Sequence, residues 1–322
     1  MVGIAYFFYG LEPYARAESQ GTTITNHDVE FRIEKNEGFR EIAGHLSQQS
    51  LIKSIAIFKL YALLTGNAQK FQPGTYVLNS SMSVPDIVRA ITERGKNDVR
   101  VVIPEGFTLK DIEQVLVDEG LLVPQALTKF DFHPLISTYP YLAHVSSLEG
   151  FLFPDTYRFE RGMSAGEMVQ TFLSAFDKKA WPLLLGSREW YITLTLASLI
   201  EKEVPRFEDR EIVAGIFLKR MKIGMPLQAD ATISYAKCGG QLQGCDGARI
   251  ARSDVNYQSP FNTYLKTGLP PTPIGNPGIE ALRAARSPKS SPYLYYLSAS
   301  ETKETIFSKT LEEHNRKRAR FL

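Results

Sequence analysis

The chain has 322 residues, a formal net charge of +2, 43% hydrophobic residues and 22% charged residues. This length indicates about two domains, and this composition excludes a disordered chain, a collagen-like repeat and a polytopic membrane protein. The 37 basic residues against 35 acidic ones provide no broad positive field, so the chain is not expected to bind nucleic acid.

The chain begins with about ten apolar residues and turns polar at Glu12. As a helix this segment is about 15 Å long, roughly half of a bilayer core. It has neither a basic region nor an A-x-A cleavage signal, so a complete signal peptide is not visible. Two interpretations fit: the second half of a membrane anchor, or an apolar tail that packs on the domain. Residues 13–27 are polar, as is typical of a linker.

Residues 28–103 are predicted to form a small α+β unit of order β-α-α-β-α-β. Alternating apolar residues predict strands, and apolar residues at helical spacing predict the helices between them. The expected strands cover residues 29–33, 75–78 and 99–103, and the expected helices cover 39–46, 52–64 and 84–91.

The remaining residues predict a larger α+β segment that is mainly helical. Helical patterns occur at 104–126, 164–179, 191–203, 209–220, 279–285 and 311–320, with one strand at 293–297 and an irregular stretch at 127–160. Pro205 is expected to stop the helix 191–203. Residues 224–278 show few periodic patterns, and long ordered loops of this kind are usually functional.

The chemistry available near 224–278 is restricted. None of the five histidines lies in that segment or on the two helices before it, which disfavours a Ser-His-Asp or Cys-His triad. The chain has no HExxH motif, no P-loop and no GxGxxG after a strand. Lys202 is considered as a Schiff-base lysine and set aside, because a lysine at a helix end is usually solvated. Cys238 and Cys245 lack the spacing of a metal site, and they are either two free thiols or one small disulfide loop.

Carboxylate chemistry remains, and the helix 191–203 carries two candidates. Glu203 lies seven residues after Leu196 and continues its apolar stripe. Desolvation there raises a carboxyl pKa and suits a general acid. Glu201 lies about 200° around the helix, so the two glutamates cannot easily share one cleft wall, and one is expected to be structural. The alternative for Glu203 is a surface charge at the helix end, although the helix dipole disfavours a carboxylate there.

Several ordered motifs resemble the endolytic murein transglycosylases of the MltG or YceG-like family. The matching blocks cover residues 148–157, 196–203, 213–230, 259–278, 293–296 and 307–315. The resemblance implies a membrane anchor, of which 1–12 is a part, the linker 13–27, a LysM-like domain at 28–103 and a catalytic domain at 104–322.

The resemblance also implies where the protein works and what it does. One N-terminal helix would hold it in the cytoplasmic (inner) membrane, with the catalytic domain on the periplasmic side beside the glycan-polymerising elongation machinery. A bridge between Cys238 and Cys245 is then favoured. The family cleaves the MurNAc–GlcNAc bond inside peptidoglycan strands without water and without a cofactor. The 6-hydroxyl of the sugar attacks C1 and leaves a 1,6-anhydro end, which needs one carboxyl acting as acid and then as base, whereas a hydrolase needs two carboxyls.

The site residues implied by the resemblance begin with the Glu-Lys-Glu triplet. Glu203 is favoured as the catalytic residue and Glu201 comes second. Val204 and Lys219 depart from the family pattern, where threonine and asparagine are common. The expected substrate-binding residues are Gln228, Asp230, Asn262, Thr263 and Tyr264.

The other residues of these blocks are expected to be structural. Glu149 and Asp155 are read as framework residues, and the prolines 270 and 271 as scaffold that stiffens the loop. Two alternatives of another class remain open: a peptidoglycan-binding protein without activity, and an intracellular lyase that uses pyridoxal phosphate. The second needs a phosphate loop, which the sequence lacks.

Overall fold

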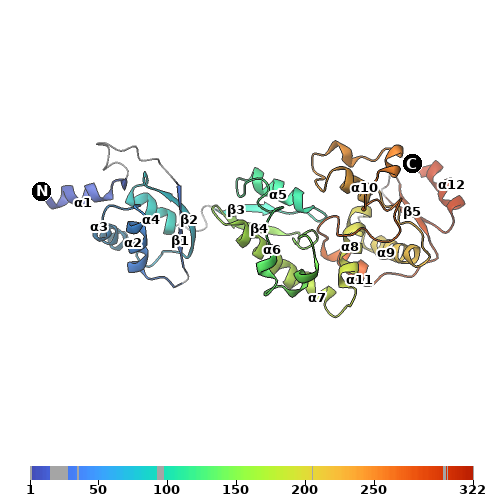
Figure 1. The fold of residues 1–322 in the computed structure, drawn as a ribbon, viewed down its shortest axis with the longest axis horizontal. Coiled ribbons are helices and arrows are strands. Elements are labelled where there is room, and N and C mark those ends of the chain that lie inside the picture. Colours follow the sequence, from blue (N-terminus) through green and yellow to red (C-terminus); the bar gives the residue numbers. More distant parts are fainter. Residues whose placement is uncertain are drawn as a thin grey trace. The chain divides into compact units, whose positions relative to one another are not determined.

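The computed structural model describes residues 2–14, 28–34, 36–92, 98–204, 206–299, 302 and 304–321. Its fold class is α+β, as the sequence predicts (Figure 1). The chain forms two compact units, which are residues 1–99 with 158–163 and residues 100–157 with 164–322. Most of the expected linker, residues 15–27, lies outside the described residues.

The first unit has its helices and strands close to where the sequence predicts them. They are α1 (Val2–Leu11), β1 (Asp28–Ile33), α2 (Phe39–Gln48), α3 (Ile55–Leu64), β2 (Gly74–Asn79) and α4 (Val84–Thr92). β1 and β2 pair antiparallel, with Asp28 opposite Asn79 and Ile33 opposite Gly74. Apolar side chains of the strands and of α2, α3 and α4 form one core, which includes Phe31, Leu46, Phe58 and Ile87.

α1 packs on α3 within this unit. Gly10 makes the close approach possible, since a Cβ there would lie 2.0 Å from Ile57 Cδ1. The Lys53 ammonium donates to the Tyr9 carbonyl at 3.4 Å. In the described part of the chain, no helix has both the length and the apolar character needed to cross a membrane.

The third strand expected for the first unit pairs elsewhere. β3 (Asp98–Val102) lies beside β4 (Thr156–Glu160). The sequence placed β4 in an irregular stretch, and that expectation was wrong. Tyr157 and Phe159 are buried while Thr156 and Arg158 are exposed, so the strand does have the period-2 pattern, over only five residues.

The second unit is mostly helical. Its helices and remaining strands are α5 (Leu109–Asp118), η2 (His133–Leu135), η3 (Pro140–His144), α6 (Ala165–Lys179), α7 (Trp181–Leu184), α8 (Trp190–Glu203), α9 (Phe207–Lys222), α10 (Asp230–Lys237), η4 (Asp246–Ala248), η5 (Arg252–Asn256), α11 (Ile279–Arg286), β5 (Tyr295–Ser298), β6 (Thr305–Ser308) and α12 (Leu311–Phe321). β5 and β6 form an antiparallel hairpin, with Tyr295 opposite Ser308.

α8 is the central helix of this unit, packed against α9, α10 and α11 (Figure 1). Residues 194–200 are buried without interruption, as expected of a helix enclosed on all sides. α8 ends at Glu203, and Val204 has extended backbone angles. Pro205, the expected stop signal, lies outside the described residues. The end of this enclosed helix carries the Glu-Lys-Glu triplet.

The segment 224–278 contains more structure than its sequence pattern indicates. α10 and the short helices η4 and η5 lie in it, and a disulfide joins Cys238 to Cys245. The sequence left free thiols and a bridge both open, and the structure has the bridge.

Removing the bridge is expected to lower stability moderately. Replacing both cysteines by serine opens a loop with a sequence separation of seven, and the chain-entropy relation gives a loss of about 2–3 kcal/mol in the free energy of unfolding. Urea unfolding with and without reductant measures it. The wild-type midpoint should fall on reduction while that of the double variant stays constant, and a wild-type midpoint insensitive to reductant would contradict the stabilising role.

Candidate active site

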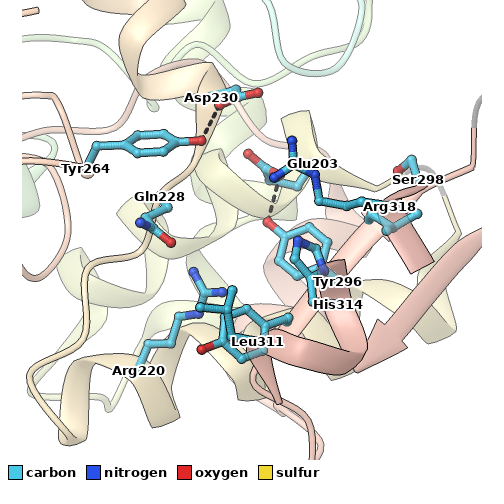
Figure 2. Close-up of a pocket in the computed structure, with 12 residues that line it drawn as sticks. Glu203, Arg220, Gln228, Asp230, Tyr264, Tyr296, Ser298, Leu311, His314 and Arg318 are labelled. Atoms are coloured by element: carbon cyan, nitrogen blue, oxygen red, sulfur yellow. Dashed lines mark hydrogen bonds between the residues drawn. The ribbon is translucent and has the colours of Figure 1, made fainter. Parts of the chain in front are cut away.

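A cavity of about 490 Å³ opens at the C-terminal end of α8. Its walls come from six places in the chain: the end of α8, the end of α9, the start of α10 with the residues just before it, the loop that carries Tyr264, the strand β5, and the helix α12. The lining residues are Glu203, Arg220, Gln228, Asp230, Tyr264, Tyr295, Tyr296, Leu297, Ser298, Leu311, His314 and Arg318 (Figure 2). The lining is polar and aromatic, which suits the hydroxyls and ring faces of a sugar.

Glu203 is the last residue of α8 and its carboxyl lies in this cavity (Figure 2). Burial raises the pKa of Glu203 to about 7. The hydrogen bond from Tyr296 lowers this pKa, the nearby charge of Asp230 raises it, and that of Arg220 lowers it. A carboxyl with a pKa near the working pH exchanges protons readily in both directions. Glu203 can therefore serve as a general acid and then as a general base.

Tyr296 holds the Glu203 carboxyl in place. Its hydroxyl donates to Glu203 Oε2 at 2.7 Å. Its ring packs edge-on against Phe217 of α9, with centroids 6.0 Å apart. Burial raises the pKa of Tyr296 well above its usual value, so the hydroxyl keeps its proton and remains a donor. One oxygen of Glu203 is thereby oriented, which leaves the other to face the cavity.

The Tyr296 hydrogen bond should be visible in the pH dependence of activity. Activity that needs protonated Glu203 falls as the pH rises through the pKa of this carboxyl. The bond favours the ionised form and lowers that pKa, so Tyr296→Phe should raise it and move the alkaline limb of kcat/KM upward by about half to one pH unit.

Tyr293→Phe is the matched control for this measurement. Tyr293 stacks on Phe307 and does not line the cavity. The alkaline limb of kcat/KM for Tyr293→Phe should therefore stay where it is in the wild type. A loss of rate in Tyr296→Phe without any movement of the limb would contradict the role assigned to the hydroxyl.

Glu201 lies outside the cavity, in a buried ion pair. Its Oε1 is 2.7 Å from the Arg210 guanidinium, and the side chains of Arg210 and Glu201 are only 6% and 5% exposed. Its Oε2 accepts from the Gly278 amide at 2.9 Å. Both carboxylate oxygens are occupied, so Glu201 ties α8 to α9 and to the start of α11. The structure does not bring the two glutamates into one site.

Three of the expected substrate-binding residues line the cavity: Gln228, Asp230 and Tyr264. The Tyr264 hydroxyl donates to Asp230 Oδ1 at 2.6 Å (Figure 2). Gln228 has φ 55°, a left-handed conformation that is costly for a residue with a side chain and is found mainly at functional sites. The backbone N–H of Gln228 donates to the Thr263 carbonyl at 3.1 Å, and this hydrogen bond holds the residue in that conformation.

Asn262 and Thr263, also expected to bind substrate, are placed elsewhere. Both are buried. The Asn262 amide donates to the carbonyls of Val255 and Tyr257 at 3.0 and 2.8 Å, and its oxygen accepts from the Tyr264 amide. The Thr263 hydroxyl accepts from the Ala229 amide at 3.0 Å. These side chains have no groups left for a ligand, and they hold the loop that carries Tyr264.

Arg220 has a structural role at the cavity wall that the sequence did not reveal. Its guanidinium donates to the carbonyls of Leu294 at 2.8 Å and Leu227 at 2.6 Å. It also lies over the Tyr295 ring, 5.2 Å from the centroid. One buried arginine thus joins α9, the segment before Gln228 and the segment leading into β5. In the sequence, this side of the cavity was indicated by the family-like motifs at 293–296 and 307–315 alone.

The residues read as framework also have partners. The buried Glu149 accepts from the Leu109 amide at 2.9 Å and the Tyr235 hydroxyl at 3.0 Å, and burial raises its pKa to about 8. Asp155 pairs with Lys179. Lys202 is not the solvated lysine expected, since it donates to the Gly106 carbonyl at 2.6 Å and burial lowers its pKa. No group of three metal-ligating side chains is found within the described ranges.

The geometry defines a class of site: one oriented, partly desolvated carboxyl at a helix end, facing a polar cavity with aromatic walls. Comparison with known proteins adds the family. The model of the YceG-like family matches residues 31–320, and the chain belongs to that family.

The chain is similar to curated relatives and to a solved structure. It is 30% identical to an endolytic murein transglycosylase of Bacillus subtilis (strain 168), covering 98% of this chain and 90% of that protein. It is also 30% identical to an endolytic murein transglycosylase of Streptococcus pneumoniae serotype 2, covering 88% of this chain and 56% of that protein. The chain thus spans just over half the length of the streptococcal relative. A crystal structure of a yceG-like protein from Listeria monocytogenes aligns with a TM-score of 0.59 and 29% identity, over 91% of this chain and 99% of that one.

Proposed function

We propose that the chain is an endolytic lytic transglycosylase that cleaves peptidoglycan at the MurNAc–GlcNAc bond. The single observation that carries this proposal is the Glu203 carboxyl, oriented by Tyr296 in the cavity at the end of α8 and with a pKa raised to about 7. The curated relatives named endolytic murein transglycosylase support the substrate.

The reaction needs one group that gives and then takes a proton. Protonated Glu203 donates to the glycosidic oxygen, the bond from C1 to that oxygen breaks, and the GlcNAc end leaves as an alcohol. The Glu203 carboxylate then accepts the proton of the MurNAc 6-hydroxyl as O6 bonds to C1. A 1,6-anhydro ring forms, Glu203 is protonated again, and no water is consumed. A pKa near 7 serves both halves of this cycle.

Asp230 has a supporting role in this proposal. Its carboxylate lies in the same cavity and its charge raises the pKa of Glu203. A fixed negative charge also stabilises the positive charge that develops at C1 as the bond breaks. A second carboxylate could instead activate a water and make the reaction hydrolytic. The products distinguish these reactions, since hydrolysis leaves a reducing MurNAc end and transglycosylation leaves an anhydro end.

Release of soluble fragments from purified peptidoglycan is the experiment that tests the proposal. The protein should release fragments from within the strands, and these fragments should carry anhydro ends. Binding to the sacculi with no change in glycan length would support a protein that only binds peptidoglycan, and would contradict the proposal.

The location of the protein belongs to the same proposal. The Cys238–Cys245 bridge supports a compartment outside the cytoplasm, where disulfides persist. The N-terminal apolar segment would then anchor the chain to the inner membrane beside the glycan-polymerising machinery. The first unit, with its β-α-α-β-α order, would be the LysM-like domain that contacts the glycan.

A further inference from the structure

One wall of the cavity belongs to α12, the C-terminal helix. Leu311, His314 and Arg318 line the cavity and are spaced three and four residues apart. This spacing puts them on one face of the helix. In Figure 2 the Arg318 side chain extends from α12 toward the side of the cavity where Glu203 lies. The lining of the cavity therefore contains the cationic side chain of Arg318 as well as the carboxyls of Glu203 and Asp230.

Arg318 differs from the other cations of α12 in its contacts. Arg316 pairs with Glu312 at 3.1 Å, Lys317 pairs with Glu313 at 2.7 Å, and Arg320 lies over the Phe321 ring. Among the residues that the structure describes, Arg318 has no carboxylate or carbonyl partner. Its guanidinium donors are free to bind a ligand, and the side chain is exposed.

The other basic groups of the cavity are not available for an anion. Arg220 donates to backbone carbonyls and is stacked on Tyr295. The His314 ring also stacks on the Tyr295 ring, with the ring centroids 5.4 Å apart. Burial lowers the pKa of His314, and the charges of Arg318 and Arg220 lower it further, so its ring stays neutral near pH 7. Arg318 is left as the accessible positive charge of this lining.

We propose that Arg318 binds a carboxylate carried by the peptide stems of the glycan strand while the sugar occupies the Glu203 side of the cavity. The inference rests on the proposed function, because it concerns the substrate of that site. The Asp230 carboxylate in the cavity repels a strand that bears acidic stems, and a guanidinium on the same wall offsets this repulsion. The planar fork of arginine matches a carboxylate. Arg318 is thus a specificity-determining residue that favours charged strands over neutral ones.

The test compares charged and neutralised strands. Stem-bearing glycan strands are used as isolated or after their carboxylates have been converted to amides, and kcat/KM for fragment release is measured with wild type and Arg318→Gln. Amidation should lower the wild-type value about fivefold, the size of a contact at an exposed charge. Arg318→Gln should show about the same loss on native strands and no further loss on amidated strands.

Arg316→Gln is the matched control, since it removes a neighbouring charge of α12 that does not line the cavity. It should keep both the wild-type rate and the wild-type sensitivity to amidation. An Arg318→Gln variant that is unaffected on native strands, or that loses activity equally on both substrates, overturns the inference while leaving the proposed function intact. A wild-type protein that releases nothing from either substrate overturns both.

Discussion

Glu203→Gln is expected to lower fragment release from peptidoglycan by about two to four orders of magnitude, the usual contribution of a general acid–base group. Glutamine keeps the size of the side chain and can still accept the hydrogen bond from Tyr296, but it cannot exchange the proton that both halves of the reaction require. The measurement is kcat/KM on purified strands at pH 6, where Glu203 with a pKa of about 7 is mostly protonated.

The stability of Glu203→Gln separates a catalytic role from a folding defect. The pKa of Glu203 rises from an ordinary value of 4.5 to about 7 in the folded chain. The folded state therefore loses stability as the pH rises between these values, because a buried carboxylate must ionise. Glutamine does not ionise, so the variant should unfold at the same temperature as wild type or higher at pH 8. A variant that is both inactive and much less stable would not support the catalytic assignment.

Arg210→Met is expected to lower the free energy of unfolding by about 3–5 kcal/mol, because it leaves the Glu201 carboxylate buried without its partner. The change also removes the hydrogen bond from Arg210 Nε to the Val204 carbonyl at 2.9 Å, which holds the chain just after Glu203. Urea denaturation measures the loss. Arg316→Met is the exposed control, because Arg316 and Glu312 are 71% and 82% exposed and such pairs contribute at most about 1 kcal/mol.

A double variant shows whether the buried charge is the cause. Glu201→Leu combined with Arg210→Met removes both charges and should recover part of the stability lost in Arg210→Met alone. Equal stability of Arg210→Met and Arg316→Met would contradict the structural role of the Glu201 pair. It would also reopen Glu201 as a candidate for the catalytic group.

The sequence pointed to the helix α8, which carries the proposed catalytic group, but burial alone could not choose between its two glutamates. The apolar stripe of the helix favours Glu203, because Leu196, Leu199 and Ile200 precede it on one face. In the structure both faces of α8 are buried, and Glu201 is nearly inaccessible. The difference lies in their partners. Glu201 faces an arginine nine residues away on α9, whereas Glu203 faces a tyrosine 93 residues away on β5, and helical periodicity carries no information about either contact.

The same limit explains the substrate-binding residues that the sequence misplaced. An amide and a hydroxyl serve equally well to bind a sugar or to fix a loop, and Asn262 and Thr263 fix the loop. Tyr264, next to them, faces the cavity. The wall formed by β5 and α12 comes from a short hairpin and a charged helix, whose patterns indicate secondary structure and give no hint of a cavity. Long-range packing decides these roles.

The chemistry proposed for Glu203 is tested most directly by mass spectrometry of the fragments that the wild-type protein releases from purified glycan strands, with Glu203→Gln run in parallel. The expected result is that new fragments end in 1,6-anhydroMurNAc, arise from within the strands, and are absent with Glu203→Gln. New ends that are reducing MurNAc would show that water attacks C1. Equal amounts of anhydro ends from wild type and Glu203→Gln would show that another group does the chemistry.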